Sequence, residues 1–127
     1  MWFIYLNEEV TEDYKDLITT IMEYLSTQVV DKIYLKCPSK YCWRNYVVPL
    51  VQYILNNLSA EPIVIMDTTN KYHLDFCEKN NIKLLSDYDI NNYIGYVLDT
   101  SGNIIDNNNN EHITIAKVEN NKITFFE

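Results

Sequence analysis

The chain has 127 residues, of which 47% are hydrophobic, and this length and composition suit one domain with a substantial core. Acidic residues outnumber basic ones by 18 to 10, so the formal net charge is −8. This balance disfavours proteins that bind DNA, RNA or anionic membranes directly, because those surfaces need a surplus of lysine and arginine. It is compatible with a partner protein that has a basic surface.

We predict neither a membrane span nor a signal peptide. No apolar run approaches the roughly 18 residues that a spanning helix needs. The apolar opening, residues 1–6, is short, lacks a preceding basic residue and is followed at once by two glutamates. The three cysteines, Cys37, Cys42 and Cys77, are therefore expected to be reduced thiols in a cytoplasmic protein.

The first strand and the first helix are clear in the sequence. Residues 2–6 form a continuous apolar run, which is typical of a strand buried on both faces. From Val10 to Leu25 the apolar residues recur at helical spacing. Acidic residues fill the first turns of this helix, where the positive end of the helix dipole favours them.

A second strand over residues 32–36 leads into a basic loop and a second helix. Ser39 can cap a helix that begins near Lys40, and an apolar stripe in one helical phase continues to Leu58. Pro49 interrupts this stripe, so either the helix is kinked or a new helix starts with Pro49 at its first position. Because the phase is kept across the proline, we predict one kinked helix.

Two further strand–helix units and an antiparallel tail complete the chain. Strands are predicted at 63–66 and 82–85, with helices over 71–79 and near 88–93. A strand at 94–98, a brief one at 104–105 and a final hairpin follow. In the hairpin, Asn120-Asn121 suits a type I′ turn. The predicted register pairs Glu119 with Lys122, Val118 with Ile123, and Ala116 with Phe125.

Alternating strands and helices predict an α/β fold. We expect a single domain over residues 1–127, with an open, mainly parallel sheet of about four β-α units and a C-terminal antiparallel β-hairpin. The layering is expected to be Rossmann-like or flavodoxin-like, with helices on both faces of the sheet. The chain is rich in Asn and has only two glycines, so Asn is expected to end elements by adopting left-handed backbone. An AT-rich coding sequence explains the abundance of Asn equally well.

Ligands of open α/β sheets bind beyond the carboxyl ends of the strands. The loops expected there contain no glycine, which disfavours a dinucleotide site or a P-loop. Their basic residues and hydroxyls form a candidate site for an anion such as a nucleotide or a phosphorylated metabolite, and solvated charges that balance the acidic first helix explain the same residues. The candidate ligand-binding residues are Lys36, Ser39, Lys40, Arg44, Thr68 and Thr69.

Other chemistry is less well supported by the sequence. The spacing from Cys37 to Arg44 is one residue longer than in phosphatase-type C-x5-R loops, and the glycines of such loops are missing, so a structural cysteine is expected. His73 and Cys77 lie four residues apart on the third helix, where we expect a packed surface pair. No set of metal ligands is complete, and we expect neither a metal nor another cofactor.

The acidic run of the first helix is the second candidate site. A solvated helix face explains it, and so does a surface presented to a basic partner, which the 11 tyrosines also favour. The candidate interface residues are Glu8, Glu9, Glu12, Asp13 and Asp16.

We therefore expect a non-catalytic acidic protein-binding module, such as an inhibitor, an immunity protein or a phage or viral counter-defence protein. The alternative is binding or turnover of an anionic small molecule at the carboxyl edge of the sheet. A third alternative is a structural subunit of a larger assembly, and a homo-oligomer is compatible with each of these functions.

Overall fold

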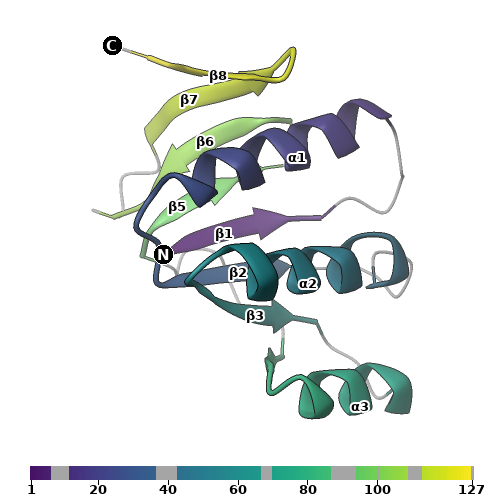
Figure 1. Cartoon of the computed structure of the whole chain (residues 1–127). Helices are drawn as coiled ribbons and strands as arrows, with labels where there is room; N and C mark the ends of the chain where they lie inside the picture. The colour runs from purple at the N-terminus through teal and green to yellow at the C-terminus, as the bar shows by residue number, and fades with distance from the viewer. Residues whose placement is uncertain are drawn as a thin grey trace.

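The computed structural model of the chain describes residues 1–6, 12–36, 43–66, 70–86, 94–99, 101–108 and 113–126, and for residues 12–14 it describes the backbone alone (Figure 1). These residues form one mixed sheet of eight strands. The strands are β1 (Trp2–Tyr5), β2 (Lys32–Lys36), β3 (Glu61–Ile65), β4 (Lys83–Leu85), β5 (Tyr96–Leu98), β6 (Asn103–Asp106), β7 (Ile113–Glu119) and β8 (Lys122–Phe125).

The strand order is β4-β3-β2-β1-β5-β6-β7-β8. Strands β1 to β5 run parallel to one another, and β1 pairs with both β2 and β5. Strands β5 to β8 continue the sheet as antiparallel neighbours. The predicted α/β class, with a parallel first part and an antiparallel end, is thus confirmed. No helix of the described residues is long and apolar enough to cross a membrane.

The helical layer lies on one face of the sheet (Figure 1). It contains α1 (Glu12–Ser26), a π-helical turn η1 (Trp43–Val47), α2 (Val48–Asn57) and α3 (Lys71–Lys79). All of them contribute to a single core cluster with the same side of the strands. The chain adds β2, β3 and β4 in one direction from β1, so right-handed crossovers bring their helices to the same face. Helices on both faces were predicted, and the described helices are one-sided; the helix predicted near 88–93 lies outside the described residues.

Strand β1 is buried on both faces, as its apolar run predicts. Trp2 and Ile4 pack into the cluster beneath the helices. Phe3 points to the opposite face, where it belongs to a smaller cluster and stacks on Tyr34 with ring centroids 4.5 Å apart. Burial of each such side chain stabilises the fold by about 1.5–3 kcal/mol. The first strand therefore joins the two layers of the core.

Pro49 is accommodated without a break in the buried stripe. The five residues of η1 precede α2, and Pro49 lies in the first turn of α2, where a missing N–H removes no helical hydrogen bond. The buried stripe keeps one phase across the proline, because Tyr46, Val47, Leu50 and Val51 are all buried. The predicted single kinked helix is instead a π-helical turn followed by an α-helix that begins at Val48, which is close to the alternative of a new helix starting at Pro49. The π-helical turn before Pro49 was not predicted.

The C-terminal hairpin has the predicted register. Glu119 pairs with Lys122, and Val118 pairs with Ile123. Both turn residues have left-handed backbone, with φ of 53° at Asn120 and 59° at Asn121. Asparagine therefore adopts here the left-handed backbone that glycine often adopts in type I′ turns.

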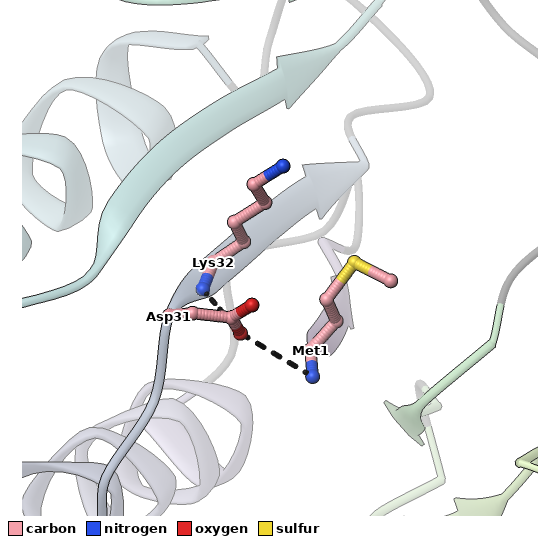
Figure 2. A network of polar contacts seen from close by, with 3 residues as sticks. All are labelled: Met1, Asp31 and Lys32. Carbon is pink, nitrogen blue, oxygen red and sulfur yellow. Dashed lines mark hydrogen bonds and ion pairs between the residues drawn. The ribbon is translucent and has the colours of Figure 1, made fainter.

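The amino ends of β1 and β2 are joined by a small polar network (Figure 2). The Asp31 Oδ1 atom accepts a hydrogen bond of 2.8 Å from the Lys32 backbone N–H and lies 3.6 Å from the Met1 amino group. The hydrogen bond from Lys32, followed by the charge of the amino group, holds the pKa of the Asp31 carboxyl below its usual value. Asp31 is exposed, so this network orients the strand ends rather than stabilising them strongly.

Replacing Asn121 by glycine tests the turn. Glycine adopts a positive φ without steric cost, so Asn121→Gly should raise the free energy of unfolding by about 0.5–1 kcal/mol. The β-branched Asn121→Val should lower it by about 1–2 kcal/mol. Urea denaturation followed by tryptophan fluorescence measures both changes. Equal stabilities for the two variants would contradict the assigned turn.

Candidate functional site

Two acidic side chains, Asp16 and Glu23, are exposed along the outer side of α1. They are seven residues apart, which is two helical turns, so they project from the same side of the helix. Thr19 lies between them and is also exposed. The opposite side of α1 is buried against the sheet through Ile18 and Ile21. The apolar stripe that forms the helix thus also fixes the direction in which its acidic residues point.

Only part of this surface was predicted from the sequence. Of the five predicted interface residues, Asp16 is exposed as expected, and Glu12 and Asp13 lie in the first turn of α1, where only the backbone is described. Glu8 and Glu9 lie outside the described residues. Glu23 was missed, although its spacing of seven residues from Asp16 placed it on the same helical side. The acidic surface therefore extends further along α1 than predicted.

The charge of α1 is strongly one-sided. Its 15 residues include four acidic ones and a single basic one, Lys15, which lies outside the last turn. Acidic residues near the N-terminus complement the positive end of the helix dipole and stabilise α1. Glu23 is close to the C-terminal end, where a negative charge opposes the dipole. Helix stability alone therefore does not explain why an acidic residue stands at position 23.

The two described residues of the predicted anion site lie in different layers. Lys36 ends β2 with its Nζ 5.6 Å from the centre of the Tyr5 ring, and Tyr5 packs on the face opposite the helices. Arg44 is exposed on η1, in the helical layer, next to the buried Trp43. The other four residues, Ser39, Lys40, Thr68 and Thr69, lie outside the described residues, as do Cys37 and Cys42. The anion site stays a prediction.

A buried aromatic cluster joins η1 to α3. The rings of Trp43 and His73 stack with centroids 4.2 Å apart, and Phe76 meets Trp43 edge-on at 5.4 Å. His73 is 6% exposed, and Cys77, one turn further along α3, is 3% exposed. A packed surface pair was predicted for His73 and Cys77. That prediction is right about packing and wrong about the surface, because α3 turns this side toward Trp43 and the core.

Burial changes the acid–base behaviour of both side chains. Desolvation lowers the pKa of the His73 imidazole, because the charged form is the one that burial penalises. Desolvation raises the pKa of the Cys77 thiol for the same reason. A raised pKa keeps this thiol protonated at neutral pH, which makes it a poor nucleophile. Within the described part of the chain, no three His, Cys, Asp or Glu residues are grouped to hold a metal ion.

A hollow of about 310 Å³ opens at the amino ends of β3 and β4. Its rim carries the exposed Glu61, Glu78 and Lys83, and Cys77 lies at its inner side. This is the sheet edge opposite to the one at which ligands of open α/β sheets bind. Its mixed charges select neither an anion nor a cation.

Comparison of the chain with models of protein families, with curated proteins and with solved structures finds no match. The exposed acidic side of α1 is then the feature with the clearest chemical preference among the described residues.

The buried imidazole predicts a dependence of stability on pH. Below pH about 6.5 the unfolded chain protonates His73 while the folded chain, with its lowered pKa, resists protonation. The free energy of unfolding should therefore fall as the pH drops through this range. In His73→Phe, which keeps a ring against Trp43, the fall should be smaller. Urea denaturation of both proteins at pH about 7.5 and about 5.5 measures the difference, and identical losses would contradict the assignment.

The predicted anion site is tested by thermal unfolding with nucleotides and phosphorylated metabolites. If the site exists, at least one of these compounds should raise the melting temperature of the wild-type chain. The shift should disappear when Lys40→Ala and Arg44→Ala are combined, because each replacement removes a positive charge from the loop. The absence of any shift across a broad panel would count against the site.

Proposed function

We propose that the chain is a non-catalytic binding protein that presents the acidic outer side of α1 to a basic surface on a partner protein. The observation that supports this is the alignment of Asp16 and Glu23, both exposed, on a helix whose other side is fixed to the sheet. An inhibitor, an immunity protein or a counter-defence protein uses such a surface to cover the basic nucleic-acid site of an enzyme.

The helix holds these charges on a rigid scaffold. Ile21 is fully buried, and Ile18, Met22 and Leu25 are each less than 5% exposed, so α1 is packed against the sheet from Ile18 to Leu25. A rigid surface loses little conformational entropy when it binds, and this favours affinity. In addition, the net charge of −8 attracts a basic partner from a distance and speeds its association.

The position of α1 suits contact with a large partner. The helix lies on one face of the sheet, over strands β1, β5 and β6 (Figure 1). Its residues also contact β7 and β8. The acidic side of α1 therefore faces away from the molecule, where a surface of a folded protein can reach Asp16 and Glu23 together.

Charge reversal on α1 tests this function. The double variant Asp16→Lys with Glu23→Lys should lose a partner that the tagged wild-type chain captures from its own cells, with affinity reduced at least about tenfold, because attraction becomes repulsion. The matched control is Asp75→Lys with Glu78→Lys on α3, where both residues are also exposed. The two variants change the formal net charge equally, so they separate a local surface from the total charge.

The control variant should capture the partner as well as the wild-type chain does. Far-ultraviolet circular dichroism shows whether each variant is folded. Capture by the folded α1 variant at wild-type affinity would overturn the proposal. Equal loss in both variants would show that net charge matters and the α1 surface does not.

A further inference from the structure

The last strand of the sheet has an open hydrogen-bonding edge. Phe126 directs its backbone N–H to Ile115 on β7, with a hydrogen bond of 2.7 Å. Backbone groups alternate in direction along an antiparallel strand, so Ile123 and Phe125 direct their N–H and C=O groups away from β7. Among the described residues no strand lies beyond β8. The outward groups of these two residues are therefore available to another strand.

Strand β8 has little of the usual protection of a sheet edge. Natural edges are kept from pairing by charges, proline, bulges or short length. The strand begins with the exposed Lys122, but residues 123–126 contain no charge and no proline, and Phe125 and Phe126 are 50% and 53% exposed. The other edge, β4, also begins with an exposed lysine, Lys83, but it has only three residues, and the two that follow Lys83 are half-buried. The apolar edge of β8 is thus the one fitted for strand pairing.

We propose that β8 pairs with β8 of a second copy of this chain, antiparallel and about a two-fold axis at Thr124. Thr124 is the midpoint of residues 122–126, so this register engages the whole strand. It places Ile123 opposite Phe125 of the second copy, which pairs the outward backbone groups and joins two apolar side chains. The same operation repeats this contact on the other side of the axis, as an isologous interface requires.

The charges of the hairpin agree with a second copy as the occupant. In residues 113–127 the charges balance, because Lys117 and Lys122 are matched by Glu119 and Glu127, whereas the whole chain has a net charge of −8. Two copies that meet through β8 therefore approach by a part of the chain without net charge, where the mutual repulsion of two acidic molecules is weak. In this register each Lys122 lies opposite Phe126 of the other copy, so the two lysines are at opposite ends of the strand pair.

Pairing of two β8 strands also prevents aggregation through this edge. An open apolar edge promotes continued strand addition, and a two-fold dimer closes both edges at once. The dimer leaves the outer side of α1 uncovered, because the new strand joins the sheet in its own plane. This interface is consequently independent of the acidic surface, and its test does not depend on the partner of α1.

Sedimentation equilibrium of the full chain tests the dimer. A monomer–dimer equilibrium is expected, and Ile123→Pro should shift it toward the monomer by about tenfold or more, because proline removes an outward N–H. An edge strand tolerates such a proline, and circular dichroism verifies the fold of the variant. A wild-type chain that stays monomeric up to the highest concentration, or an unchanged equilibrium in folded Ile123→Pro, would overturn the proposal.

Disulfide formation tests the register. In a background with Cys37→Ser and Cys42→Ser, Thr124→Cys places two thiols at a non-hydrogen-bonded pair with Cα atoms about 4.5 Å apart, which a disulfide spans. The matched control is Lys122→Cys, exposed on the same face, where the two thiols would lie about 13 Å apart. Oxidation should link Thr124→Cys into a dimer and leave Lys122→Cys unlinked. Equal linkage of the two variants, or none of Thr124→Cys, would overturn the register.

Discussion

The structure depends on the burial of β1 on both of its faces. This strand pairs with β2 on one side and β5 on the other, so the parallel part of the sheet grows from it in both directions. Ile4 is fully buried beneath the helices, and Phe3 is 2% exposed on the opposite face. A strand in this position tolerates no polar side chain on either face, which accounts for its continuous apolar sequence.

The direction in which strands are added from β1 determines which face the helices cover, and therefore which side of α1 is exposed and acidic. Because β2, β3 and β4 follow one another on one side, their crossovers place α1, α2 and α3 on the same face. Helix α1 is then packed by its apolar side alone and has a solvent-exposed acidic side. The antiparallel strands β6 to β8 extend the sheet beyond β5, where β7 and β8 contact α1, and end in an apolar edge. One topology thus produces an acidic outer surface and an open strand as separate features.

Local patterns predicted the elements well because their causes are local. The left-handed turn at Asn120-Asn121 fixed the register of the hairpin, and the apolar spacing of α1 fixed which side is buried. Features that depend on distant contacts were not found. His73 and Cys77 are buried because α3 packs against Trp43, a contact that no spacing within α3 reveals. The position of the described helices on one face likewise depends on strand order, which is set by pairing between segments far apart in the sequence.

The candidate site was predicted in part for the same reason. The exposure of Asp16 followed from helical phase, and the same phase placed Glu23 beside it. The separation of Lys36 from Arg44 could not be predicted from their nearness in the sequence. Lys36 alternates along β2 with the buried Ile33 and Leu35, so its side chain leaves the sheet on the face opposite the described helices. Arg44 belongs to the helical layer on the other face.

The most direct test of the proposed function is the salt dependence of association with the captured partner. If the acidic side of α1 meets a basic surface, the association rate constant should fall steeply between about 0.05 M and about 0.5 M salt, because screening shortens the range of the attraction. The dissociation rate should change much less over the same range. An association rate that is unaffected by salt would contradict the account, since the charge of α1 would then have no part in recognition.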